Sequence, residues 1–302
     1  MLNLLHEGHF GIQKTLSRAT AIMYWPGFSK DIEEMVKTCD MCIRYRRSQE
    51  KEPMISHEVP ARPWEELATD LFEIEGKKWL VVVDCYSSFF EMCPMNQNTK
   101  APAVILQMKS MFARHGVPVV VYSDNGPPYN SEEYVRFAEE YNFTIKTSSP
   151  EYPQSNRKAE SAVKAAKAIL QKSSDRYAAL MEYRASPLTG IGKSPSELLY
   201  GRVMRTKLPC SAEMLNAKQS MSDVVREKMK INKEREKHYY DRNAGSELPE
   251  LEPGEDVYVQ RGKQWEPAKV LRKSNVRSYQ IQPDRGQEIR RNRRYLLRSH
   301  KQ

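Results

Sequence analysis

The order of apolar segments between residues 64 and 172 restricts the fold more than any other feature of this sequence. Three strand-like segments come first, and helical and strand-like segments then alternate. This order predicts a mixed sheet with helices packed on it. The expected strands are residues 64–74, 77–87, 89–95, 118–125 and 143–149, and the expected helices are residues 101–116, 131–142 and a last helix that starts near Lys158.

A second constraint is a pair of histidines and a pair of cysteines near the amino terminus. His6 and His9 have two residues between them, and Cys39 and Cys42 form a Cys-x-x-Cys motif. This motif aims two thiolates at one point, and two histidines from another element can complete the tetrahedral set that Zn²⁺ prefers. Cys-x-x-Cys alone could be a redox pair, and two histidines alone are more often surface residues. Together, in a segment with little core of its own, they predict a structural zinc site.

The charge balance favours a polyanionic partner. The chain has 302 residues, with 48 Lys and Arg against 39 Asp and Glu, for a net charge of +9. Such an excess favours nucleic acid over a membrane, although a merely basic soluble protein is the plainer alternative. The scattered cysteines do not form a disulfide framework, and we see neither a signal peptide nor a long apolar run, so we expect an intracellular protein.

Composition divides the chain into five expected segments. The second of them is polar, lacks periodicity and carries prolines, which is typical of a linker. The fourth is one long helical pattern rich in charges, from about Ala212 to Arg242, and the last is again β-like. The expected boundaries are a zinc-binding region at residues 1–48, a linker at 49–62, an α/β core at 63–211, a helical connector at 212–248 and a β-rich domain at 249–302.

Carboxylates at the ends of expected elements form a second candidate metal site. Asp70 lies at the end of the first strand, Asp124 ends a buried strand, and Glu160 begins the last helix. Such carboxylates can converge at one edge of a sheet, and hard oxygen ligands suit Mg²⁺ or Mn²⁺. Two such ions would activate the attacking oxygen and stabilise the leaving oxygen of a phosphodiester. Charge alone does not select this set, because Asp84 and Glu91 are also acidic and close to strands.

The motifs around these residues resemble integrases of gypsy-type LTR retrotransposons, within the retroviral integrase superfamily. "HEGHFGIQKT" and "YWPGFSKDIEEMVKTCDMC" resemble their zinc-binding domain, whereas "YSDNGPPYNSEEY" and "KAESAVKAAK" resemble their catalytic core. The stretch from "LEPGEDVYVQRG" to "RGQEIRRNRRYLLR" resembles their carboxyl-terminal barrel. The resemblance implies a multidomain protein with a small helical zinc-binding domain, an α/β ribonuclease-H-like catalytic core and an SH3-like all-β barrel.

The resemblance also implies which carboxylates act. Matched motif by motif, the Asp, Asp-35-Glu triad of the family falls on Asp70, Asp124 and Glu160, with 35 residues between the last two. The implied enzyme is a polynucleotidyl transferase with endonuclease activity, which processes the 3′ ends of element DNA and transfers them into target DNA. Two alternatives stay open: a host-adopted DNA-binding or regulatory protein without catalysis, and a ribonuclease-H-type nuclease.

Cofactors and partners follow from the same reasoning. We expect Mg²⁺ or Mn²⁺ at the triad and structural Zn²⁺ at His6, His9, Cys39 and Cys42. The expected partners are the element ends and the target DNA, together with further copies of this chain in a homo-oligomer, and no membrane. The expected location is the nucleus, or the cytoplasm before nuclear entry.

Several basic and amide side chains are candidates for contacts with DNA. Lys164 and Lys167 lie four and seven residues after Glu160, on its own helix face, where they would meet phosphates. Asn125 and Asn156 are candidates for contacts with DNA or with the triad. The run "RGQEIRRNRRYLLR" has six arginines against one glutamate, which also fits a nuclear-localisation signal. Its candidate phosphate contacts are Arg290, Arg291, Arg293 and Arg294.

The sequence departs from the family pattern in the loop before the last helix. The family usually has glycine after the asparagine of this loop, whereas this chain has Arg157. Glycine would let the loop flex and let DNA approach closely, and arginine adds charge but removes that freedom.

Overall fold

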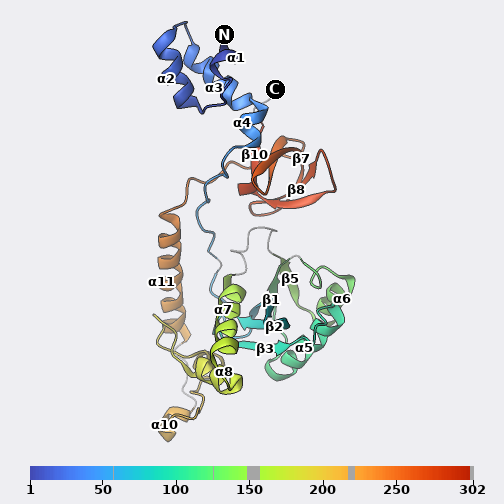
Figure 1. The fold of residues 1–302 in the computed structure, drawn as a ribbon. Helices are drawn as coiled ribbons and strands as arrows, with labels where there is room; N and C mark the ends of the chain where they lie inside the picture. Colours follow the sequence, from blue (N-terminus) through green and yellow to red (C-terminus); the bar gives the residue numbers. More distant parts are fainter. Residues whose placement is uncertain (57, 125, 148–156, 217–221, 300–302) are drawn as a thin grey trace. The chain divides into compact units, whose positions relative to one another are not determined.

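A computed structural model describes the chain in two compact units (Figure 1). One unit comprises Met1–Pro53 with Asn243–Gln302, and the other comprises Met54–Arg242. Within the described residues, none of the helices combines the length and apolar character needed to cross a membrane. The described residues are 1–56, 58–124, 126–147, 157–216 and 222–299.

The second unit is built on a five-stranded mixed sheet, as the sequence predicts. Its strand order is β3-β2-β1-β4-β5. The three leading strands pair antiparallel, whereas β1 pairs parallel with β4, and β4 pairs parallel with β5. The ribonuclease-H-like fold is therefore confirmed for this part of the chain. The strands are β1 (Glu66–Ile74), β2 (Lys77–Asp84), β3 (Phe90–Pro94), β4 (Val120–Ser123) and β5 (Thr144–Thr147).

Local signals set the ends of the helices in this unit. The hydroxyl of Ser131 accepts the backbone N–H of Tyr134 and caps α6. Gly116 ends α5 with a φ of 93°, a backbone conformation that glycine adopts without strain. A capping box between Ser194 and Glu197 starts α9. The helices are α5 (Ala101–His115), α6 (Glu132–Tyr141), α7 (Arg157–Lys172), α8 (Arg176–Ala185) and α9 (Pro195–Tyr200).

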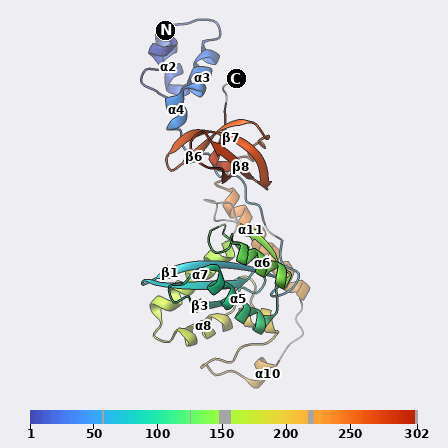
Figure 2. The same cartoon turned by 90° about the vertical axis from the view of Figure 1, so that its right-hand side faces the viewer.

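The sheet carries a hydrophobic layer on each face. Alternate residues of β1 point to opposite faces, so that Leu67 packs with α5 and α6, whereas Ala68 and Phe72 pack with α7 and α8. The views in Figures 1 and 2 show α7 and α8 on one side of the sheet and α5 and α6 on the other. Asp70 has the same parity as Ala68 and Phe72, so it lies on the face that α7 covers.

The connector after the core differs from the expected single helix. Helix α10 (Ala212–Leu215) ends at Asn216, whose ψ of 137° is extended, and α11 (Ser222–Asp241) follows separately. The expectation of one helix over residues 212–242 is therefore wrong at Asn216. Asparagine is a poor residue for a helix interior because its amide competes for backbone hydrogen bonds. Val225 and Met229 of α11 are buried in one cluster with Leu198.

The first unit begins with a small helical domain. A single hydrophobic cluster holds it together, centred on the buried residues Leu5, Ala19, Ile32 and Val36. So few buried side chains make a marginal core, as the sequence predicts for this segment. The helices are α1 (Leu2–Leu5), α2 (Ile12–Ile22), α3 (Phe28–Thr38) and α4 (Asp40–Arg44).

The first unit also contains an antiparallel sheet that curves into an SH3-like barrel (Figure 2), which confirms the expected fold of the carboxyl-terminal part. Its strand order is β10-β6-β7-β8-β9, and every pair is antiparallel. A register shift interrupts the pairing of β7 with β8 after Val270. The elements are β6 (Asp256–Arg261), β7 (Gln264–Asn275), β8 (Ser278–Pro283), β9 (Ile289–Asn292), the 3₁₀ helix η2 (Arg293–Tyr295) and β10 (Leu296–Arg298).

Candidate functional site

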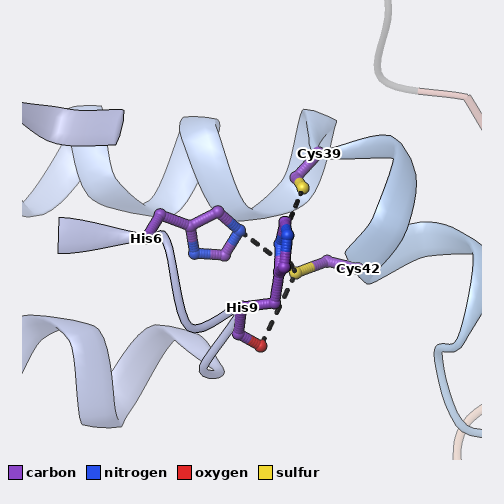
Figure 3. Close-up of side chains that lie close together, drawn as sticks. All are labelled: His6, His9, Cys39 and Cys42. Atoms are coloured by element: carbon purple, nitrogen blue, oxygen red, sulfur yellow. Dashed lines mark hydrogen bonds between the residues drawn. The ribbon is translucent and has the colours of Figure 1, made fainter. Parts of the chain in front are cut away.

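The structure brings the four predicted zinc ligands together (Figure 3). Their ligand atoms all lie within 4.8 Å of one another. Among the described residues, these four form the set of three or more His, Cys, Asp or Glu side chains whose ligand atoms lie close enough to share a metal ion. His6 follows α1 directly, and His9 stands in the turn after it with a φ of 48°. Cys39 joins α3 to α4, and Cys42 lies within α4.

The separations between these atoms fit a tetrahedral metal. Cys42 Sγ lies 3.1 Å from His6 Nε2, and Cys39 Sγ lies 3.4 Å from His9 Nδ1. Zinc bonds of about 2.0–2.3 Å in a tetrahedron imply N···S separations of about 3.5 Å. All four corners come from protein side chains, so this set suits a structural zinc ion with no position for a substrate.

Burial and close neighbours shift the pKa values of two of these four side chains. Burial, followed by the proximity of Cys39, raises the pKa of Cys42 to about 11. Burial and the neighbouring His9 lower the pKa of His6. Zinc binds thiolate and neutral imidazole, so a bound ion would favour ionisation of Cys42 and the neutral form of His6.

Two of the three predicted carboxylates belong to neighbouring parts of the sheet. In the parallel pair of β1 and β4, Ala68 lies opposite Tyr122. If the register continues for two residues, Asp70 comes level with Asp124, on the face that α7 covers. Asp70 lies in the middle of β1 and not at its end, where the sequence predicts it, whereas Asp124 directly follows β4 and Glu160 lies in the first turn of α7.

The pKa of Asp70 responds to the other two acids of the predicted triad. Burial and, after it, the negative charges of Asp124 and Glu160 raise the pKa of Asp70 to about 6. The backbone N–H of Leu71 and the cation of Lys167 act in the opposite direction. Like charges gathered in a half-buried place disfavour ionisation until a cation compensates them, so the donor set fits a divalent metal with oxygen ligands.

The turn after β4 holds the carboxylate of Asp124 at the sheet edge. The backbone N–H of Gly126 donates to Asp124 Oδ1 over 3.1 Å. A Cβ at Gly126 would lie 3.2 Å from Asp124 Oδ2, so glycine permits this close approach. The buried hydroxyl of Tyr129 then bonds to that of Thr69, next to Asp70, at 3.1 Å. Our sequence reasoning missed Thr69 and Tyr129, because a contact between distant segments leaves no local pattern.

The two competing acids have structural partners. Asp84 is fully buried and accepts the backbone N–H groups of Trp64, Tyr86 and Ser87. Asp84 ends β2, and its hydrogen bonds connect the following turn to the residues just before β1. Both of its carboxylate oxygens already accept hydrogen bonds, so Asp84 is a poor candidate for a metal ligand.

Glu91 lies in a cluster of cations. Its carboxylate is 2.9 Å from His115 Nε2 and 3.0 Å from Arg184 Nη2, and Arg114 lies nearby. Burial opposes ionisation of Glu91, but the hydrogen bond from His115 and the charges of Arg184 and Arg114 outweigh it and lower its pKa to about 2. This environment neutralises Glu91 without a metal, in contrast to that of Asp70.

The two predicted lysines of α7 differ in their surroundings. Lys164 is exposed, as a phosphate contact requires. Lys167 is half-buried, with its ammonium 5.8 Å from the centre of the Phe72 ring, and its charge lowers the pKa of Asp70. Lys167 therefore lies close enough to act on the carboxylate site. Asn125 and Asn156 lie outside the described residues, as does the side chain of Arg157.

The four predicted arginines of the barrel are not equivalent. Arg293 is 4% exposed, and its guanidinium donates to the carbonyls of Pro249 and Leu296. The structure therefore assigns Arg293 a structural role inside the barrel in place of the expected DNA contact. The other three are half-buried: Arg290 donates to Ser278, Arg291 to the carbonyl of Arg290, and Arg294 to that of Gln49.

Comparisons with known proteins match both the zinc-binding region and the core domain. The family model "Integrase zinc binding domain" matches residues 1–48, and "Integrase core domain" matches residues 60–153. Among the curated relatives that align with most of the chain, "Uncharacterized protein K02A2.6" of Caenorhabditis elegans is 28% identical over 298 residues, which are 93% of this chain. The "Transposon Tf2-3 polyprotein" of Schizosaccharomyces pombe is 24% identical and covers 84% of it. The chain spans only 23% and 21% of the length of these two relatives.

A solved structure shares the whole fold. The "CryoEM structure of simian T-cell lymphotropic virus intasome in complex with PP2A regulatory subunit B56 gamma" contains a chain that matches with a TM-score of 0.63. The match covers 99% of each chain at 15% sequence identity. At that identity the likeness concerns the fold.

Proposed function

We propose an integration reaction for this chain, on the premise that it carries the zinc-binding and core domains of the integrase family and is related to retroviral and transposon polyproteins. The proposed activity is metal-dependent processing of the 3′ ends of element DNA, followed by transfer of those ends into target DNA. The observation that supports the proposal is that the negative charges of Asp124 and Glu160 both act on the half-buried carboxyl of Asp70 and help to raise its pKa.

The residues of the triad would hold one or two divalent ions between them. When bound, Mg²⁺ or Mn²⁺ would supply activation of the attacking oxygen and stabilisation of the leaving oxygen. Asp70 lies on β1 and Asp124 directly follows its parallel neighbour β4. Glu160 closes the set from α7, whose alanine face is buried on the sheet.

Each step of the proposed reaction exchanges one bond to phosphorus for another. In 3′ processing a water oxygen attacks phosphorus, and the bond to the leaving 3′ oxygen breaks. In strand transfer the freed 3′-hydroxyl attacks a phosphorus of the target DNA, and the target's own 3′ oxygen leaves. Lys164, exposed on the helix that carries Glu160, is suited to hold a phosphate of the bound DNA beside the triad.

Zinc and oligomer formation complete the proposal. The zinc ion would stabilise the amino-terminal helices and take no part in chemistry, since its four corners are filled by His6, His9, Cys39 and Cys42. The matched viral structure is an intasome, and we extend to this chain the proposal that several copies act together on DNA. Action on chromosomal DNA would require that it reach the nucleus.

The test is a strand-transfer assay with Mg²⁺ on oligonucleotides that carry the terminal-repeat ends of the source element. We compare wild type, Glu160→Gln and the matched control Glu139→Gln, an exposed glutamate on α6. Loss of one metal-binding carboxylate should reduce product roughly a hundredfold or more, since several kcal/mol of stabilisation are lost. The control should match wild type, and all three proteins should bind DNA.

Two outcomes would contradict the proposal in different ways. Equal product from wild type and Glu160→Gln would show that the triad does not perform the reaction. DNA binding by wild type without any product, in Mg²⁺ and in Mn²⁺, would instead favour a DNA-binding protein that has lost catalysis.

A further inference from the structure

Residues 46–53 have neither helix nor strand, yet they are held against the barrel along their whole length. We expected most of this segment, from residue 49 on, to be a linker because it is polar, lacks periodicity and carries prolines. In the structure it lies within the same compact unit as the barrel. Its one fully buried side chain is a carboxylate, that of Glu52, which is 3% exposed. A polar linker has no reason to bury a charge, so this segment requires a different explanation.

The amino-terminal end of the segment is held by β6 and β7. The indole N–H of Trp265 donates to the carbonyl of Arg46 over 2.9 Å, and Gln260 Nε2 donates to Ser48 Oγ over 2.7 Å. Just before the segment, Ile43 is buried in one cluster with Trp265 and Tyr258. Ile43 directly follows the zinc ligand Cys42, so the contact starts next to the metal site.

The middle of the segment is bound through Gln49. Its side-chain amide donates to the carbonyls of Arg294 and Leu296, over 2.9 and 2.8 Å. In return, Arg294 Nε donates to the carbonyl of Gln49 over 3.1 Å. These bonds tie Gln49 to η2 and to the start of β10.

The carboxyl-terminal end is anchored by a buried ion pair. Glu52 Oε1 lies 3.3 Å from Arg277 Nε, with the two side chains 3% and 11% exposed. The same oxygen accepts the backbone N–H of Leu248, and Arg277 also donates to the carbonyl of Pro53. Burial lowers the pKa of the Arg293 guanidinium, and the negative charge of Glu52 acts in the opposite direction.

The charges of the two partners are complementary. Arg277 and Arg293 both lie within the barrel, where a guanidinium needs a nearby anion to offset its loss of hydration. The carboxylate of Glu52 comes from another part of the chain, more than two hundred residues away in sequence. Removal of residues 46–53 would leave Arg277 and Arg293 without the carboxylate of Glu52.

We propose that the barrel has a peptide-binding face, built by Gln260, Trp265, Arg277 and Arg294, whose occupant is the chain's own residues 46–53. Glu52 is the anchor of this interaction. The segment is accordingly a structural part of the barrel, and it fastens the zinc-binding helices to it. The arginines that hold the segment are thereby engaged with protein, which separates them from the basic side chains available to DNA.

The test compares Glu52→Gln with Glu50→Gln in the zinc-loaded full chain. Glu50 lies in the same segment and is exposed, so it controls for the loss of one negative charge. Hydrogen exchange followed by mass spectrometry reports on residues 46–53 and on β10 directly. In Glu52→Gln, Arg277 keeps only the exposed carboxylate of Glu247 as an anionic partner, and loss of the buried partner should accelerate exchange in these regions by roughly tenfold or more. The control should exchange as wild type does, and the strands of the core should be unchanged in both.

A milder variant keeps the proposal testable if Glu52→Gln unfolds the barrel. Gln49→Ala removes only the two amide bonds and should raise exchange in the same two regions by about three- to tenfold. Equal exchange in Glu52→Gln and Glu50→Gln, or no response to Gln49→Ala, would overturn the proposal.

Discussion

At the scale of single residues, environment separates acids that look alike in the sequence. Asp70, Asp84 and Glu91 all lie on or beside the leading strands. Asp84 is held by backbone donors and Glu91 by cations, so both carboxylates are compensated within the protein. Asp70 instead lies near two further negative charges, and its pKa is raised to about 6. These surroundings destabilise the ionised form of Asp70, and a bound cation would stabilise it.

Asp70→Asn should therefore change how stability depends on pH. The folded pKa lies above the ordinary value, so the folded chain binds a proton more tightly than the unfolded chain does. The stability due to Asp70 is fully present below the ordinary pKa and is lost as pH rises through about 6. At pH 8 without Mg²⁺, the variant should be more stable than wild type by about 1–2 kcal/mol, allowing for solvent screening.

Urea unfolding of the zinc-loaded protein measures this difference between about pH 4.5 and pH 8. These two pH values lie about 1.5–2 units on either side of the shifted pKa of Asp70. Glu73→Gln, an exposed position on the same strand, should show no such trend. Added Mg²⁺ should stabilise wild type more than Asp70→Asn at pH 8. A difference between wild type and Asp70→Asn that stays constant over this range would show that the site does not perturb the carboxylate.

At the scale of elements, α7 determines where the third carboxylate lies. Ala159, Ala162 and Ala166 are 0–3% exposed and pack against β1 and β2, while Glu160 stands beside this face in the first turn. Small side chains let the helix approach the sheet closely, and Glu160 in its first turn is near enough to influence the pKa of Asp70.

A larger side chain on the alanine face should push the helix away. We expect Ala166→Leu to destabilise the core domain by about 1–3 kcal/mol, because the sheet beneath it has no room for the added atoms. The control Gln171→Leu introduces the same side chain at an exposed position of α7 and should change stability by less than about 0.5 kcal/mol. Urea unfolding followed by circular dichroism measures both, and equal values for the two variants would refute close packing at Ala166.

At the scale of the whole molecule, the chain consists of two units with separate hydrophobic clusters. The clusters on the two sheet faces contain residues of the core unit only. The zinc ligands and the small cluster beside them belong to the other unit. Loss of zinc should therefore act on the amino-terminal helices and leave the core sheet intact.

Cys39→Ser tests this division. Wild type should contain about one equivalent of zinc per chain, and the variant should lose it, because a structural ion needs all four ligands. Hydrogen exchange should become fast over residues 1–45 and stay unchanged in β1–β5. Cys210→Ser, which removes a cysteine far from the cluster in sequence, should keep both zinc and protection. Unchanged metal content in Cys39→Ser would contradict the ligand assignment.

Patterns that depend on neighbouring residues could be predicted well from the sequence. The strand and helix order of the core, the cap at Ser131 and the helix end at Gly116 all rest on local chemistry. The break at Asn216 was missed, because the charge pattern on either side of it is equally helical. The strand β10 and the helix η2 were hidden within a basic run that we interpreted by its charge alone.

The sequence by itself determined the ligands of the zinc site and the order of the core elements, because spacing and periodicity act over a few residues. Only the tertiary structure decided which acids lie uncompensated, and that Arg293 is enclosed in the barrel. It also showed that Glu52 serves as an anchor and not as part of a linker. The physical reason is common to these cases: the energy of a charge depends on its hydration and on charges brought near it by folding, and neither is encoded in its immediate neighbours.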